Sequence, residues 1–173
     1  FAELGISKVR LTGGEPLLKK GVPDLIRRIK NFPGIREVVM TTNGVLLKPF
    51  AEDLKKAGLD RINVSLDTLD RENFKRITGL DKLGDVLAGI EAAASAGIEP
   101  IKINVVLMKG YNDKEVLPLV RFAIERSFQI RFIEWMPTVG EIQSVRENRF
   151  LSSDCAKHQV EEHYRLAPDD SSP

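Results

Sequence analysis

The sequence predicts an α/β fold built on a parallel sheet, and two observations carry that prediction. Strand-sized apolar segments rich in β-branched residues alternate with longer amphipathic segments, and glycines follow several of the amphipathic segments where helices would end. Repeated units of this kind need right-handed crossovers between parallel strands. They build either a (β/α) barrel or an open doubly wound sheet, and both architectures bind ligands beyond the carboxyl ends of the strands.

The elements can be assigned in chain order. The predicted strands are Lys8–Thr12, Glu37–Thr41, Arg61–Leu66, Ile101–Met108 and Ile130–Trp135. The predicted helices are Val22–Asn31, Pro49–Ala57, Arg71–Ile77 with Val86–Ala96, and Lys114–Ser127. Gly34, Gly58 and Gly97 stand where three of these helices are expected to stop. Residues 1–6 resemble the last turn of a helix closed by Gly5, and the chain begins with Phe1 rather than Met, so we expect further residues upstream.

The alternation ends after Pro137, which sets the predicted domain organisation. Residues 1–137 form the core of one domain, and residues 138–165 begin a C-terminal extension. Within that extension Ser152 is placed to cap a helix that runs to about Tyr164. Residues 166–173 are rich in Pro, Asp and Ser and are predicted to be a disordered tail.

The composition is that of an ordinary globular domain. The chain has 173 residues, of which 42% are hydrophobic and 29% charged, and its net charge is +1. This balance supplies no general field for nucleic acid or an anionic membrane, so we expect any anion to be bound locally. The apolar segments are only strand-sized and no leader peptide is visible. We expect a soluble cytoplasmic protein, or a mitochondrial one if the source is eukaryotic.

The single cysteine, Cys155, excludes a disulfide framework and a multi-cysteine metal or cluster site within these residues. Cys155, His158 and His163 share the predicted C-terminal helix, but the two histidines are five positions apart and do not lie one turn apart on the same face. We therefore predict an ordinary helix surface there, and no metal ligands in this chain.

Polar residues and glycines gather at the ends of the predicted strands. These ends are Thr12–Glu15, Thr41–Gly44, Ser65–Asp67, Lys109–Asp113 and Glu134–Pro137. Because the carboxyl ends of parallel strands meet at one edge, the pattern favours a ligand site there. The same residue types also form turns and cap helices, so a purely structural edge is the alternative.

The first of these turns contains Gly13, Gly14, Glu15 and Pro16. Paired glycines let a ligand touch the backbone because no Cβ stands in the way, and the proline prevents the strand from continuing. Glu15 places a negative charge where a cationic group of a ligand could dock. The alternative is a strand-to-helix turn with a solvated glutamate.

Arg10 and Lys102 lie within predicted strands, and Lys102 shares its strand face with Asn104. A cation inside a parallel barrel is costly unless it meets an anion, and a phosphate ligand would satisfy both side chains. The alternative is that each extends outward to solvent or pairs with Asp67 or Glu134.

Three further positions at the strand ends are candidate contacts. Thr41 and its neighbours through Gly44 could hold a ligand that carries hydroxyl groups, and Ser65 and Asp67 offer a donor and an acceptor on one face. Met136 follows the last strand, where it packs in the core, forms a lid over the barrel mouth or lies against a flat heterocycle.

Five motifs in series resemble one family. They are RLTGGEPL at 10–17, TTNG at 41–44, RINVSLD at 61–67, KINVVLMKGYND at 102–113 and RFIEWMP at 131–137. GGEP alone is typical of the whole radical S-adenosylmethionine (SAM) superfamily. The series at these spacings is similar to the GTP 3′,8-cyclases of molybdenum cofactor biosynthesis, and the likeness covers nearly all of residues 1–165.

The resemblance implies a partial TIM-type barrel whose first strand is missing from this chain. It implies SAM contacts at Gly13, Gly14, Glu15, Ser65 and Met136. It implies GTP contacts at Arg10, Thr41 and Lys102. It places no catalytic side chain in this segment, because SAM bound to a [4Fe–4S] cluster would supply the radical that removes hydrogen from C3′ of GTP before C3′ bonds to C8.

The chain departs from the family pattern in its cysteines. The family's cluster ligands lie outside the matched segment, and Cys155 corresponds to none of them, so we expect this piece alone to be inactive. The resemblance also implies a homodimer and delivery of the product to the enzyme that builds the cyclic pyranopterin. A truncated homologue that binds nucleotide or SAM without radical chemistry, and a different radical SAM enzyme, are the alternatives.

Overall fold

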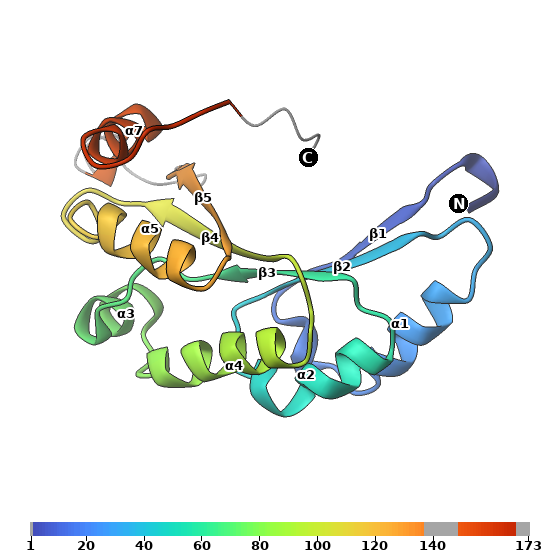
Figure 1. The fold of residues 1–173 in the computed structure, drawn as a ribbon. Helices are drawn as coiled ribbons and strands as arrows, with labels where there is room; N and C mark the ends of the chain where they lie inside the picture. Colours follow the sequence, from blue (N-terminus) through green and yellow to red (C-terminus); the bar gives the residue numbers. More distant parts are fainter. Residues whose placement is uncertain (1, 137–148, 169–173) are drawn as a thin grey trace.

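The computed structural model describes residues 2–136 and 149–168, and its centre is a parallel sheet (Figure 1). The strands are β1 (Lys8–Leu11), β2 (Glu37–Thr42), β3 (Arg61–Ser65), β4 (Ile101–Leu107) and β5 (Gln129–Glu134). They pair in the order β1-β2-β3-β4-β5, each beside its neighbour in the chain. An order without reversal is that of a (β/α) barrel and not of a doubly wound sheet, which confirms the predicted partial barrel.

Helices connect the strands. They are α1 (Val22–Lys30), α2 (Leu47–Lys56), α3 (Arg71–Thr78), α4 (Leu83–Ser95), α5 (Val116–Glu125) and α7 (Ser153–Glu161). Short 3₁₀ turns stand at η1 (Ala2–Leu4) and η2 (Pro16–Leu18). Gly58 and Gly97 follow the ends of α2 and α4 with φ of +95° and +77°, as the sequence predicted.

Several helix boundaries differ from the prediction. Helix α2 begins two residues before Pro49, because a proline in the first turn lacks only an N–H that has no helical partner there. Helix α4 begins at the buried Leu83 rather than at Val86. The prediction that Gly34 ends α1 was wrong, because the helix already stops at Lys30, three residues before Pro33, which could not continue it.

One face of the sheet, which we call the convex face, packs against the helices and carries the core. Every second strand side chain points to it, and those of β2, β3 and β4 are buried against the apolar faces of α1, α2, α4 and α5. Fully buried members include Ile26, Met40, Leu54, Ile62, Ile90 and Ile103. Helices α2 and α4 approach so closely that a Cβ on Gly89 would lie 2.6 Å from the carbonyl oxygen of Gly44.

The opposite side of the sheet, which we call the concave face, receives the alternate side chains. In Figure 1 the helices α1, α2 and α4 lie together on one side of the sheet, and among the described residues none of them covers the other side. Its strand residues are mostly polar or cationic. They are Lys8, Arg10, Glu37, Val39, Thr41, Arg61, Asn63, Ser65, Lys102, Asn104, Val106, Gln129, Arg131 and Ile133.

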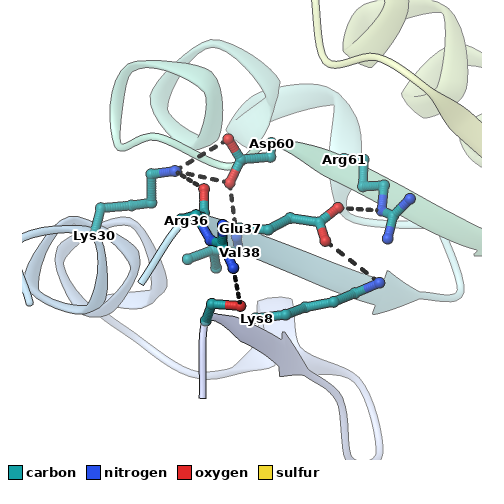
Figure 2. Close-up of polar contacts among 8 residues, drawn as sticks. Lys8, Lys30, Arg36, Glu37, Val38, Asp60 and Arg61 are labelled. Atoms are coloured by element: carbon teal, nitrogen blue, oxygen red, sulfur yellow. Dashed lines mark hydrogen bonds and ion pairs between the residues drawn. The ribbon is translucent and has the colours of Figure 1, made fainter. Parts of the chain in front are cut away.

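The amino-terminal end of the sheet is held by two carboxylates on opposite faces (Figure 2). Asp60 accepts hydrogen bonds from Lys30 Nζ at 2.9 Å and from the Val38 N–H at 2.6 Å. Glu37 forms ion pairs with Lys8 at 3.3 Å and with Arg61 at 2.6 Å. The first carboxylate ties a helix to the sheet, whereas the second lies wholly among strand residues.

Helix α7 packs against α5 and the last strand. Ala156 and Val160 join a small apolar cluster with Leu107 and Val120. Glu134 at the end of β5 accepts hydrogen bonds from the N–H of Ser153 at 2.8 Å and from its hydroxyl at 3.0 Å. These two bonds hold the pKa of Glu134 below its usual value.

Two of the predicted boundaries lie at or beyond the limits of the described residues. The predicted end of the core at Pro137 and most of the predicted tail 166–173 fall outside the described residues, while α7 lies within the predicted extension 138–165. In the described part of the chain, no helix has the length and apolar character needed to cross a bilayer.

Candidate functional site

The glycine turn after β1 exposes its backbone. Gly13 has φ of +138°, a conformation that side-chain-bearing residues rarely adopt, and a Cβ built on Gly13 or Gly14 would meet no atom within 4 Å. The space beside the turn is therefore open, which suits a ligand that contacts main-chain atoms.

The Glu15 carboxylate is held by three hydrogen bonds from the protein. Its Oε1 accepts from the Leu17 N–H at 3.0 Å and from the Thr42 hydroxyl at 2.8 Å. Its Oε2 accepts from the Asn43 N–H at 2.8 Å. Glu15 therefore fastens the glycine turn to the end of β2, and whether it also contacts a cationic group of a ligand stays a prediction.

The two threonines at the end of β2 have different roles, one within the protein's own hydrogen bonds and one facing the candidate site. Thr42 is buried and its hydroxyl also accepts from the Gly44 N–H at 3.1 Å, so it belongs to the Glu15 network. Gly44 has φ of +80°, and a Cβ there would lie 3.0 Å from Val64 and from Val86. Thr41 faces the other way, and its buried hydroxyl has no hydrogen-bond partner.

Strand register brings the predicted concave residues into rows. Thr41 pairs with Asn63 and Asn63 with Lys102, so these three side chains lie side by side across the sheet. Ser65 pairs with Asn104, and Asn104 in turn with Arg131, one step nearer the carboxyl ends. The Asn104 Oδ1 atom is buried without a hydrogen-bond partner. Unpartnered buried polar atoms cost free energy, so both rows are suited to a polar ligand.

The cations of the concave face outnumber its carboxylates. Lys8, Arg10, Arg61, Lys102 and Arg131 all belong to it, against Glu37. Glu37 pairs with Lys8 and Arg61 only, and no other ion pair to these cations is present among the described residues. An anion bound above Glu37 would therefore meet uncompensated positive charge from several strands.

Lys102 carries the strongest sign of an unmet anion. Its side chain is buried, with the residue only 8% exposed. Burial, followed by repulsion from Arg131, Arg61 and Lys8, holds the pKa of Lys102 below its usual value. A bound anion would remove this penalty.

Asp67 and Glu134, the alternative partners for Arg10 and Lys102, bind other groups of the protein. Asp67 accepts from the Val106 N–H at 2.7 Å, and Glu134 caps α7. Burial raises the pKa of Asp67, while the Val106 hydrogen bond opposes that shift. The structural alternative in which these carboxylates neutralise the two cations is therefore wrong.

Ser65 lies beside a small pocket at the ends of β2 and β3. Its lining includes Asn43, Ser65, Asp67 and Phe74, and its volume is about 120 Å³. Met136 lies two residues after β5 and is 77% exposed, so it is not part of the core. An exposed Met136 is compatible with both remaining interpretations, a lid over the barrel mouth and a contact with a flat heterocycle.

Sequence reasoning missed several members of the concave face. Lys8, Arg61, Asn63 and Arg131 were not singled out, although the first three lie an even number of residues from a candidate on the same strand. Extending the two-residue alternation from Arg10, Ser65 and Lys102 would have found the first three, but Arg131 needed the strand register.

A partial parallel barrel with a glycine turn and a row of hydroxyl, amide and cationic groups facing its open side defines the class of protein. The family model described as the radical SAM superfamily matches residues 1–123, and the chain belongs to that superfamily. Radical SAM proteins use SAM with a [4Fe–4S] cluster.

Within the superfamily, the chain is most informatively compared with two relatives of the same name. The chain is 50% identical over 159 residues to a GTP 3′,8-cyclase from Thermodesulfovibrio yellowstonii, which covers 92% of this chain and 49% of that relative. It is 45% identical over 172 residues to a GTP 3′,8-cyclase from Alkaliphilus metalliredigens, covering 99% of this chain and 53% of that relative. The chain thus spans about half the length of the curated relatives it matches.

Solved structures support the fold. A radical SAM methyltransferase from Sphaerobacter thermophilus superimposes with a TM-score of 0.70 at 18% identity, covering 90% of this chain and 47% of that one. A domain of pyruvate-formate lyase-activating enzyme from Bacteroides vulgatus gives a TM-score of 0.67 at 19% identity, covering 88% and 90%.

The two superfamily cofactors fit this chain differently. The open backbone at Gly13 and Gly14 and the exposed hydroxyl of Ser65 suit SAM. The sequence holds one cysteine, which lies exposed on α7, and no cluster of three or more His, Cys, Asp or Glu suited to a metal occurs among the described residues. These residues cannot supply the thiolates that a [4Fe–4S] cluster requires.

Proposed function

We propose that this chain is the central segment of a GTP 3′,8-cyclase, which converts GTP to 3′,8-cyclo-7,8-dihydro-GTP in the first step of molybdenum cofactor biosynthesis. The observation that carries the proposal is the buried, unpaired Lys102 in a row of polar side chains just below the glycine turn. A nucleoside triphosphate supplies the missing anion, and the identity to GTP 3′,8-cyclases supports the choice of nucleotide.

SAM occupies the carboxyl-end edge of the sheet in this proposal. The backbone of Gly13 and Gly14 contacts its methionine moiety, Ser65 donates or accepts at a polar group, and Met136 lies beside the adenine. Glu15 contributes through the three bonds that hold the turn to β2 rather than through direct charge.

GTP occupies the concave face. Arg10 and Lys102 bind its phosphates by charge-assisted hydrogen bonds, and the free hydroxyl of Thr41 bonds to the nucleotide. When bound, SAM with a reduced cluster would supply the radical that removes the C3′ hydrogen. The residues of this chain hold C3′ of GTP close to that radical and exclude water, which is where the protein contributes to the rate.

The proposal places the cluster's cysteine ligands in residues beyond this chain. It also includes a cytoplasmic enzyme, mitochondrial if the source is eukaryotic, that forms a homodimer and passes its product to the enzyme that builds the cyclic pyranopterin. The division into a core at 1–137, an extension from 138 and a tail from 166 belongs to the same proposal.

The test is anaerobic reconstitution of the protein from its complete reading frame. With SAM, GTP and a reductant we expect 5′-deoxyadenosine, methionine and the cyclised nucleotide in equal amounts. Binding of GTP without turnover would favour a non-catalytic homologue. Cleavage of SAM without GTP binding would favour a different radical SAM enzyme.

Two substitutions test the residue roles. Arg10→Ala and Lys102→Ala should each weaken GTP binding by about 10- to 100-fold, the range for one charge-assisted contact, while SAM binding is retained. Loss of both ligands together would indicate misfolding, and unchanged GTP affinity would remove these residues from the phosphate site.

A further inference from the structure

The amino-terminal floor of the concave face carries an acidic residue among cations. Among the described strand residues that face this side, Glu37 is the one with a carboxylate side chain, and it is the first residue of β2. Its Oε1 lies 2.6 Å from Arg61 Nε and its Oε2 lies 3.3 Å from Lys8 Nζ (Figure 2). The side chains of Glu37 and Arg61 are 29% and 16% exposed, so this pair is shielded from solvent more than a surface ion pair.

The pairing divides the cations by height along the sheet. Lys8 is level with Glu37, and Arg61 is level with Val39, one step higher on that face. Lys102 and then Arg131 follow toward the carboxyl ends. Glu37 thus pairs with Lys8 and with Arg61, and the three groups together keep one net positive charge. Arg10 is level with Arg61, and it and the higher Lys102 and Arg131 have no carboxylate partner among the described residues.

This division matters for the depth at which a polyphosphate binds. An anion is drawn to uncompensated charge, and Glu37 both removes two cations from competition and repels phosphate oxygens at the floor. Ligands of this architecture enter from the carboxyl ends, so the terminal phosphate is the part that approaches Glu37.

We propose that Glu37 is a positioning residue that forms the floor of the phosphate site and sets how far the triphosphate enters the barrel. This inference rests on the proposed function and adds to it a specific device: by stopping the phosphate chain at Arg10, Lys102 and Arg131, Glu37 keeps the sugar level with the SAM turn. C3′ is then held at the reacting position.

Glu37→Gln separates this role from a purely structural one, because it removes the charge and keeps the shape. Lys8 and Arg61 become available, so inorganic tripolyphosphate and GTP should bind about tenfold tighter, with a steeper loss of affinity at high salt. The sugar should sit too deep, and kcat should fall by about tenfold or more. A residue that only stabilised the fold would not tighten ligand binding when replaced.

The experiment uses the reconstituted full-length protein, with tripolyphosphate and GTP affinities measured by titration calorimetry at two salt concentrations and kcat measured under saturating GTP. The matched control is Glu52→Gln, which removes a carboxylate that pairs with Lys56 on the exposed face of α2. It should leave affinities and kcat unchanged. Unchanged or weaker polyphosphate binding in a folded Glu37→Gln protein overturns the inference.

A second variant covers the case in which Glu37→Gln does not fold. Arg61→Gln removes a cation that is already paired with Glu37, so it should weaken tripolyphosphate binding by no more than about threefold, well below the effect of Lys102→Gln. An equal loss in the two variants overturns the inference. If the wild-type protein binds no GTP, the proposed function itself fails, whereas GTP binding with unaltered affinity in Glu37→Gln removes only the role of Glu37.

Discussion

The two faces of the sheet follow opposite rules. The convex face is apolar, and side chains such as Met40, Ile62 and Ile103 have no exposed surface. The concave face carries cations without partners and two buried polar atoms, Thr41 Oγ1 and Asn104 Oδ1, that form no hydrogen bond. The first face stabilises the protein, and the second leaves polar groups unpaired, which suits a ligand-binding face.

The difference lies in which residue of each strand pair faces which side. Successive side chains alternate, so a strand such as Ile101–Leu107 contributes isoleucine and valine to the core and lysine and asparagine to the site. Substitutions one residue apart should therefore damage different properties. Each of the following predictions tests that separation.

The largest effect is expected from a close contact on the convex side. Gly89→Ala would place a Cβ 2.6 Å from the Gly44 carbonyl oxygen and 3.0 Å from Leu47 Cβ, so α2 and α4 must move apart. We expect a loss of about 2 kcal/mol or more in the free energy of unfolding. Gly84→Ala in the same helix meets no atom within 4 Å and should stabilise by about 0.5 kcal/mol. Urea unfolding of the two variants checks this, and equal effects would contradict the close packing.

Replacing Lys102 should lower ligand affinity and not stability. Replacing this buried cation with Met should leave the melting temperature unchanged or raised, while GTP affinity falls by about 10- to 100-fold. A lower melting temperature without a change in affinity would place Lys102 with the structural residues.

The lowered pKa of Lys102 gives a pH test of the same idea. Its protonated form binds the anion, so GTP affinity should decline as the pH rises through a range below that of an ordinary lysine. Binding should raise the pKa again and take up a proton. Lys102→Arg stays charged and should remove this pH dependence, and calorimetry in buffers of different ionisation enthalpy measures the proton uptake.

Glu15 is expected to affect both the stability of the fold and the binding of a ligand. Glu15→Ala leaves the Thr42 hydroxyl and the Leu17 and Asn43 N–H groups without their acceptor. We expect about 1 to 2 kcal/mol lower stability together with weaker SAM binding. Thermal unfolding and equilibrium dialysis of SAM check the two parts. SAM binding that is lost without any change in stability would instead indicate direct contact.

The smallest effect is expected at Asp67. Its pKa is raised by burial, so its ionised form is disfavoured in the fold, and its stability contribution falls as the pH rises through that raised pKa. Asp67→Asn can still accept from the Val106 N–H and should be more stable near neutral pH by less than about 1 kcal/mol. Unfolding free energies measured from the ordinary carboxyl pKa, about 4, up to neutral pH should vary less with pH for the variant.

Much of this architecture could be predicted from the sequence. The β-branched segments located all the strands to within one residue at most ends, because buried parallel strands are short continuous apolar runs. Strand alternation placed Lys102 and Asn104 on one face, and the motif series identified the superfamily. Helix starts were less predictable, since Leu47 and Leu83 begin helices through burial against the sheet rather than through capping side chains.

The site could be predicted only in part, because its polar groups depend on partners distant in the chain. Glu15 is indistinguishable in sequence from a ligand-binding carboxylate, and only the fold shows its oxygens engaged with Thr42 and Asn43. Likewise, the pairing of Glu37 with Lys8 and Arg61 joins three strands and has no local signal. Predicting it requires the register of neighbouring strands.

The Glu15 carboxylate joins two positions that serve different ligands. In the proposed function the glycine turn that Glu15 anchors contacts SAM, while the end of β2 that Glu15 also holds carries Thr41, which contacts the nucleotide. If a ligand displaces the glycine turn, the end of β2 must move with it, because Glu15 connects the two by hydrogen bonds of 2.8 Å. We therefore expect occupancy by either ligand to change the affinity for the second, by the same free energy whichever binds first.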